Sequence, residues 1–274
     1  MTQQTPYVLG TGDDELQRLS LQHRLWADAA HSAFRRAGIT IGQRVLDVGC
    51  GPGFAAFDLA QLVTRQGLVI GVDESAPFLT YLEQQAHARE LPQLRARQGD
   101  VQRLGEVVGH EAPFDLAYAR WVLCFVSDPA AVLAGVAAAL RQGGRFVVHD
   151  YFNYGAMTLA PRHTSHDRAV QATIAAWRQR GGDPDVVGKL PGLLEGAGLT
   201  VEHLDVHQRI ARGSDSMFAW MDTWWHTFAP KLVTMGLLSG AEADDLLAEL
   251  AERRGDPNTF AHCPPVYELI ARKR

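Results

Sequence analysis

The sequence is poor in cysteine, and the placement of its three cysteines excludes the usual uses of clustered thiols. Cys50, Cys124 and Cys263 are odd in number and far apart, and no CxxC or similar ligand spacing occurs. We therefore expect no disulfide framework and no metal site. Each cysteine is interpreted as a small buried hydrophobic residue.

We also expect no membrane span, no signal peptide and no basic stripe of a nucleic-acid binder. Its longest uncharged apolar stretch, residues 129–140, is short and alanine-rich, which indicates a buried helix. The first 19 residues have neither the basic nor the apolar region of a signal peptide, so we expect a cytoplasmic protein without membrane partners. The net charge is −5 and the basic residues are dispersed, which argues against a nucleic-acid partner.

What is present is the pattern of a globular α/β chain. With 46% hydrophobic residues over 274 positions the chain can bury a real core. A helix is predicted over residues 13–37, with Gly38 ending it. Apolar runs then alternate with helical segments, which favours a doubly wound parallel sheet covered on both faces. Strands are predicted at 43–49, 67–73, 94–100, 114–123 and 143–151, and helices at 54–66, 75–90 and 128–142.

The pattern changes after Tyr151. A loop with one long helix is predicted over 155–182, and a helical region over 213–254 holds three of the six tryptophans. Between and after them we predict a helix at 184–198 and strands at 199–210 and 264–274. The predicted division is an N-terminal helical cap (1–39), a binding core (40–152), and a part (153–274) that completes the sheet and carries helical lid insertions at about 155–182 and 213–254.

The first strand runs into a glycine-rich turn, VLDVGCGPG (residues 45–53). Glycines between a strand and a helix let a ligand approach the backbone and the helix N-terminus. A dinucleotide fingerprint, GxGxxG, would need a third glycine where Phe54 or Ala56 stands, so an NAD-dependent dehydrogenase is disfavoured.

Acidic residues lie at the ends of three successive predicted strands. Asp47 precedes the glycine turn, Asp73 with Glu74 ends the second strand, and Asp100 ends the third beside Val101. Carboxylates at this edge can accept hydrogen bonds from ribose hydroxyls or an adenine amine. The set suits an adenosine with a positive appendage better than a pyrophosphate. Asp47 could instead be a structural acid that binds loop amides.

These motifs, followed by FDLAYARWVLCFVSDP and LRQGGRFVVHDY, resemble the class I S-adenosylmethionine-dependent methyltransferases over about residues 40–152. The resemblance implies a Rossmann-like seven-stranded sheet whose last strand is antiparallel, and S-adenosylmethionine as cofactor with S-adenosylhomocysteine as product. It implies that the glycines hold the methionine part of the cofactor, Asp73 the ribose, and Asp100 with Val101 the adenine. Residues that it places near the cofactor also include Gly49, Gly51, Gly53, Arg120, Trp121 and, more loosely, Tyr7 and Gln22.

In such enzymes the sulfonium supplies the activated methyl group, and the protein aligns the acceptor for in-line displacement. Positioning of this kind contributes roughly 7–11 kcal/mol to lowering a barrier. His149 and Tyr151, which leave the fifth predicted strand beside the methyl group, are the candidates for a base or an acceptor-orienting group. Histidines of the predicted lid are weaker candidates.

The expected acceptor is a small, aromatic or apolar metabolite under the helical lid. Candidate pocket residues are Trp220, Trp224, Trp225 and His226, although the spacing of Trp220, Trp224 and Phe228 fits a core stripe as well. The arrangement resembles ubiquinone, menaquinone and natural-product methyltransferases. An NPPY-type tetrapeptide is missing, which argues against methylation of nucleic-acid bases.

Two alternatives remain open at this level. One is an RNA or protein methyltransferase, which a basic surface around the pocket would favour. The other is a non-catalytic protein that binds the cofactor, which bulky side chains beside the methyl group would favour. The sequence is compatible with a monomer or a homodimer.

Overall fold

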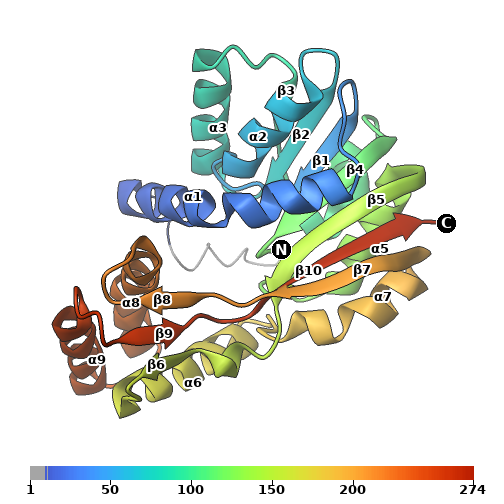
Figure 1. Ribbon diagram of the computed structural model, residues 1–274. Coiled ribbons are helices and arrows are strands. Elements are labelled where there is room, and N and C mark those ends of the chain that lie inside the picture. The colour runs from blue at the N-terminus through green and yellow to red at the C-terminus, as the bar shows by residue number, and fades with distance from the viewer. Residues whose placement is uncertain (1–9, 11) are drawn as a thin grey trace.

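A seven-stranded sheet in the order β3-β2-β1-β4-β5-β10-β7 organises the chain (Figure 1). The computed structural model describes residue 10 and residues 12–274. β10 is antiparallel to both of its neighbours and the other paired strands are parallel, so the predicted sheet is confirmed. The strands are β1 (Arg44–Val48), β2 (Leu68–Asp73), β3 (Leu94–Gln98), β4 (Phe114–Arg120), β5 (Leu140–Tyr151), β7 (Leu199–His207) and β10 (Val266–Lys273).

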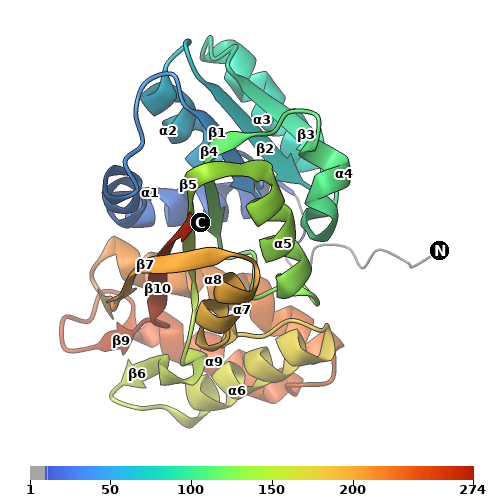
Figure 2. The same cartoon turned by 90° about the vertical axis from the view of Figure 1, so that its right-hand side faces the viewer.

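Helices cover both faces of this sheet (Figures 1 and 2). One face carries α1 (Asp13–Arg36), α2 (Phe54–Val63) and α3 (Ala76–Ala88), and the other carries α4 (Leu104–Val108), α5 (Pro129–Ala139) and α7 (Leu190–Gly196). Side chains alternate between the two layers: Val45 is buried in the first and Leu46 in the second. This is why the strands are apolar at nearly every position.

Two helix starts follow the sequence rules closely. The Ser75 hydroxyl accepts from the backbone N–H of Phe78 at the start of α3, and Asp128 accepts from that of Ala131 at the start of α5. Their helices leave the carboxyl ends of β2 and β4, so these caps also fix the loops at the edge where ligands bind in open α/β sheets.

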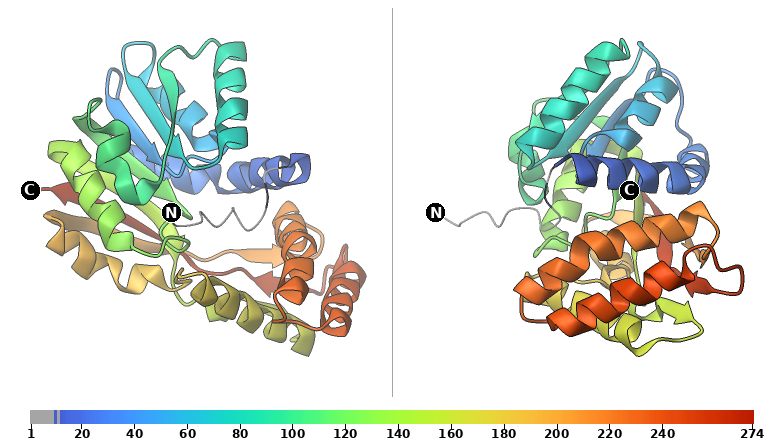
Figure 3. Two further views of the ribbon diagram at one scale, coloured as in Figure 1. Left: turned by 180° about the vertical axis from the view of Figure 1, so that it is seen from behind. Right: turned by 90° about the vertical axis from the view of Figure 1, so that its left-hand side faces the viewer.

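The second half of the chain builds a separate layer below that edge (Figure 3). It contains α6 (Thr164–Gln179), α8 (Ser216–Thr234), α9 (Gly240–Arg253) and a small antiparallel sheet. α8 packs against α1, which brings the N-terminal helix and this layer together. The strands of the small sheet, in the order β6-β9-β8, are β6 (Thr158–Ala160), β9 (Phe260–His262) and β8 (Ile210–Arg212).

The sequence predictions for this layer need two corrections and one refinement. The small sheet was not expected, because strands of three residues are too short to show an alternating pattern. The single strand predicted over 199–210 is split into β7 and β8. The helical region predicted over 213–254 is two helices, separated around Ser239, which caps α9 with Glu242.

Within residues 10 and 12–274, no helix combines the length and the apolar character that crossing a bilayer requires.

Candidate active site

A cavity of about 840 Å³ is lined by residues at the carboxyl ends of the parallel strands, together with residues of α1, α6 and α8. Small-molecule sites typically occupy roughly 300–1,000 Å³. The predicted site residues that line it are Asp47, Gly49, Gly51, Asp73, Glu74, Asp100, Val101, Arg120, Trp121, Tyr151, Gln22, Trp220 and Trp224. Tyr7 lies outside the described residues.

The glycine turn has three glycines in the left-handed conformation, and different atoms lie next to each of them. Gly49 has φ +67°, and a Cβ there would lie 2.5 Å from Cγ2 of Val122. Gly51 has φ +53° and open space where its Cβ would be, on the cavity wall. Gly53, φ +87°, packs against Leu82 and does not line the cavity. The structure thus corrects the assignment of Gly53: it allows α2 to approach α3, and only the other two can face a ligand.

Asp73 ties this turn to the end of β2. Its carboxylate accepts from the backbone N–H of Gly51 at 2.8 Å and from that of Ser75 at 2.9 Å. Burial raises the pKa of Asp73, and these N–H groups oppose the rise. A carboxylate has about four acceptor positions, so Asp73 keeps capacity for a ligand hydroxyl.

Asp100 and Val101 form the next part of the wall. The Asp100 carboxylate accepts from the backbone N–H of Gln102 at 2.8 Å and caps the short turn Val101–Arg103. Val101 is buried beneath it. The acids at the ends of β2 and β3 therefore converge on one cavity, as their positions at the ends of neighbouring parallel strands predict.

The cavity has two halves, and the half next to the glycine turn contains two groups of opposite charge, Asp47 and Arg120. Asp47 is 2% exposed, and its Oδ2 has no hydrogen-bond partner. Burial raises the pKa of Asp47 to about 7, with Asp73 adding to the rise and Arg120 opposing it. Arg120 contacts Nδ1 of His23 at 3.1 Å, while its Nη1 is buried without a partner. An unsatisfied carboxylate oxygen and an unsatisfied guanidinium nitrogen fit the ammonium and carboxylate of an amino-acid tail.

Aromatic side chains form the other half of the cavity. Trp121, at φ +53°, stacks on Tyr151 with ring centroids 6.1 Å apart and on Trp220 at 6.4 Å. The indole N–H of Trp220 donates to Oε1 of Gln22 at 3.0 Å, which joins α8 to α1. Trp224 lies beside them on the wall. This half offers flat apolar surfaces with few polar groups.

Two of the predicted pocket residues are elsewhere on α8. Trp225 is fully buried and packs edge-on against His166, away from the cavity. His226 is half exposed and contacts the backbone oxygen of Asp222. Successive helical residues are turned by about 100°, so the two residues after Trp224 point away from the wall. Trp225 is therefore a core residue and His226 a surface residue.

The structure does not bring His149 to the cavity either. Its ring is 2% exposed and lies between the Tyr118 hydroxyl and the Glu268 carboxylate, beneath α1. Burial lowers the pKa of His149, against an opposing effect of Glu268. The sequence predicts that His149 and Tyr151 both leave β5 beside the cofactor's methyl group. Tyr151 stands at the last residue of the strand, where it reaches the cavity, and His149 is two residues farther inside the sheet.

Several cavity residues were not predicted. Arg18, four residues before Gln22, lies on the same face of α1, so helical spacing could have indicated it. Its guanidinium binds Glu15 and Gln22 and lies 5.7 Å from the ring centroid of Trp224. For the others, the pattern of the sequence does not indicate which side chains face the cavity. They include Tyr118, Phe125, Tyr154, Met157, Trp177 and Arg180.

Comparison with known proteins identifies the family. Residues 39–189, more than half of the chain, match the methyltransferase domain family. The chain belongs to this family, and the resemblance to class I S-adenosylmethionine-dependent methyltransferases is confirmed.

Two relatives and one solved structure illustrate the match. The chain is 34% identical over 146 residues to trans-aconitate 2-methyltransferase of Deinococcus radiodurans, covering 50% of this chain and 52% of the relative. It is 34% identical over 105 residues to aklanonic acid methyltransferase DauC of Streptomyces sp. strain C5, covering 38% and 46%. The chain thus spans about half the length of these curated relatives. The YcgJ protein of Bacillus subtilis shares the fold, with a TM-score of 0.61 at 16% identity over 90% of this chain and 99% of that one.

Proposed function

We propose that the protein transfers a methyl group from S-adenosylmethionine to a small aromatic or apolar metabolite. The observation that carries this proposal is one continuous cavity with two chemically different halves. Asp47, Asp73 and Arg120 make one half polar and charged, and Trp121 and Trp224 make the other aromatic. The first fits the cofactor and the second fits a flat acceptor beside it.

The cofactor supplies the activated methyl group, and the protein contributes position. Gly51 leaves room for the methionine part and Gly49 supplies the left-handed backbone that shapes the turn, while Asp47 and Arg120 hold the ammonium and carboxylate of the cofactor. Asp73 and Glu74 hold the ribose, and Asp100 with Val101 holds the adenine. Trp121 and Tyr151 then fix the acceptor in line with the methyl group and exclude water, which contributes roughly 7–11 kcal/mol.

The acids of the described cavity wall, including Asp47 with its pKa of about 7, lie in the cofactor half, so the aromatic half offers no carboxylate to deprotonate an acceptor. Among the described residues of the cavity wall there is no histidine. Burial raises the pKa of Tyr151 well above its ordinary value and also raises that of Tyr154, so both phenols stay neutral near pH 7. Tyr151 is therefore a positioning group. Carboxylates and stabilised enolates or phenolates need no general base.

Two guanidinium groups on the aromatic half favour an organic acid. Arg18 and Arg180 lie on the wall of the cavity, where guanidinium N–H groups can bind a carboxylate, while the Glu15 carboxylate holds Arg18 in place and offsets its charge. Two relatives also carry the names of acids, trans-aconitate and aklanonic acid. A flat acid with an apolar body is the acceptor class that combines these features.

The test is a transfer assay with methyl-labelled S-adenosylmethionine and a panel of aromatic and unsaturated acids, each beside its neutral amide. We expect label in the acids and little in the amides. Tyr151→Phe keeps the ring and should reduce transfer less than about tenfold, whereas removal of a true base costs about 10²–10⁴-fold. Transfer to RNA or protein alone, or equal transfer to acids and amides, would contradict the proposal.

The cytoplasmic location, the monomeric or homodimeric state and the three-part division of the chain stay predictions.

A further inference from the structure

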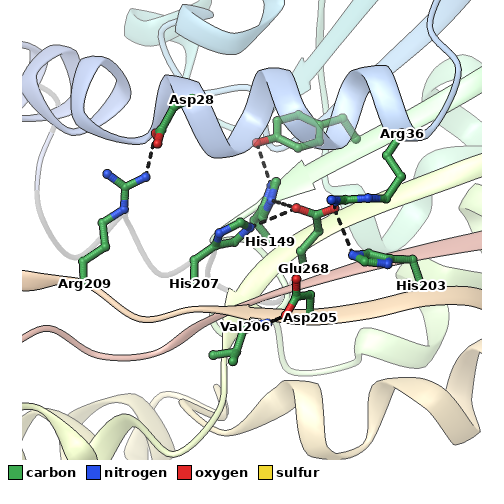
Figure 4. A network of polar contacts seen from close by, with 10 residues as sticks. Asp28, Arg36, His149, His203, Asp205, Val206, His207, Arg209 and Glu268 are labelled. Atoms are coloured by element: carbon green, nitrogen blue, oxygen red, sulfur yellow. Dashed lines mark hydrogen bonds and ion pairs between the residues drawn. The ribbon is translucent and has the colours of Figure 1, made fainter.

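A second cluster of functional groups lies outside the cavity, on the sheet face that α1 crosses (Figure 4). It consists of His149 on β5, Glu268 on β10, and His203 and His207 on β7. Glu268 pairs directly with His149 on one side and with Asp205 on the other, so these three share a face of the sheet. The two β7 histidines flank Asp205 at a spacing of two residues and therefore face the same way.

The ligand atoms of three of these residues are close together. Nε2 of His207 is 2.9 Å from Oε2 of Glu268, and Nε2 of His149 is 3.4 Å from the same oxygen. All three atoms lie within 4.8 Å of one another. A tetrahedral Zn²⁺ with bonds of about 2.0–2.1 Å holds its ligand atoms about 3.3 Å apart, so two of the three separations are already near that value.

Neighbouring side chains orient the three candidate ligands, as residues hydrogen-bonded to metal ligands do in metal sites. The Tyr118 hydroxyl contacts the other ring nitrogen of His149 at 3.2 Å, which sets the orientation of the ring. Arg36 binds the other carboxylate oxygen of Glu268, Oε1, and thereby turns Oε2 toward the two imidazoles. Glu268 is fully buried and His149 nearly so, whereas His207 is 25% exposed and gives an ion access from solvent.

We propose that His149, His207 and Glu268 form a binding site for one divalent transition-metal ion of the Zn²⁺ type. Two imidazoles and one carboxylate are a set that Zn²⁺ and its neighbours accept, with a fourth position left for water. His203, whose Nε2 is 3.5 Å from Oε1 of Glu268, lies on the other side of the carboxylate from the two imidazoles, next to Arg36, and is not one of the ligands (Figure 4). Arg36 stays on Oε1 in this arrangement and leaves Oε2 for the ion. The ion would join β5, β10 and β7 beneath the end of α1.

The cysteine spacing, from which the sequence analysis expects no metal, could not reveal such a site, because its ligands come from three strands.

The test uses the full chain without an affinity tag, after removal of metal with a chelator, titrated with Zn²⁺ and separately with Co²⁺. We expect one ion per chain with a dissociation constant in the micromolar range or below, and visible absorption of a four-coordinate Co²⁺ site. His207→Ala removes a ligand at the exposed rim and should weaken binding by more than about tenfold, since loss of an outer group alone costs about 10–100-fold. Glu268→Gln should do the same.

His226→Ala is the matched control, because it removes a histidine of α8 that lies outside the cluster. Its metal affinity should equal that of the wild type. Circular dichroism verifies folding, and if Glu268→Gln fails to fold, the comparison of the two histidine variants decides. Absence of stoichiometric binding, several weak ions per chain, or equal affinity of His207→Ala and His226→Ala would overturn the proposal.

Discussion

The two halves of the cavity are built in different ways. The cofactor half comes from the ends of β1, β2 and β3 and a nearby arginine, all within residues 47–120. The acceptor half combines Trp121 and Tyr151, at the ends of β4 and β5, with residues of α1, α6 and α8, and its members Gln22 and Trp220 are 198 residues apart in the chain. The first depends on local geometry at strand ends, and the second depends on the packing of distant helices. We expect substitutions in the two halves to separate cofactor binding from acceptor binding.

The largest effect should come from the neighbouring tryptophans of α8. Trp225→Ala empties a fully buried position and should cost about 3–5 kcal/mol of unfolding free energy, measured by urea denaturation. Trp224→Ala removes a partly exposed wall residue, so it should cost less stability and raise the acceptor KM while the cofactor affinity is kept. If Trp224→Ala lost as much stability as Trp225→Ala, Trp224 would be a core residue and not part of an acceptor site.

Asp73→Ala should act on the cofactor half alone. It removes the acceptor of the partly buried N–H groups of Gly51 and Ser75, which loosens the turn, and it removes the carboxylate assigned to the ribose. We expect S-adenosylmethionine to bind about 100-fold more weakly in calorimetry. Glu83→Ala, at an exposed acid of α3 outside the cavity, should leave that affinity within about threefold, and an equal loss there would refute the assignment.

The glycines offer a narrower comparison within the cofactor half. Gly49→Ala forces a Cβ into a left-handed residue and against Val122, which should cost about 2 kcal/mol of stability. Gly51→Ala meets no atom, so it should cost about 1 kcal/mol through its backbone alone and weaken the cofactor by closing the space next to it. Thermal melting and calorimetry on both variants distinguish the two outcomes, and the reverse pattern would contradict this account.

The smallest effect is a pH dependence at Asp47. Its pKa of about 7 in the folded chain is above the ordinary 3.8, so its contribution to stability is complete below pH 3.8 and is lost as the pH rises through 7. The cofactor's ammonium favours the carboxylate form, so binding should release a proton and become about tenfold tighter between about pH 6 and pH 8. Calorimetry in buffers of different ionisation enthalpy measures this proton. Asp47→Asn should abolish the release, and a wild-type affinity that stays constant over this range would contradict the pairing.

The same contrast explains what the sequence could predict. The acids, the glycine turn and the seven-stranded sheet follow from strand–helix alternation and from the rule that parallel strands end at one edge. Trp177 and Arg180 were missed because their place on the wall depends on how α6 meets α8. Trp225 and His226 were misplaced because an aromatic run does not show which side of a helix faces a cavity. His149 was misplaced because its neighbours on β10 are more than 100 residues away.

The most direct measurement is calorimetric titration of the wild-type chain with S-adenosylmethionine, S-adenosylhomocysteine and NAD. We predict micromolar binding of the two sulfur compounds, one per chain, and none of NAD. Binding of NAD, or no binding of either sulfur compound, would contradict the assignment of the glycine turn and its three acids to this cofactor.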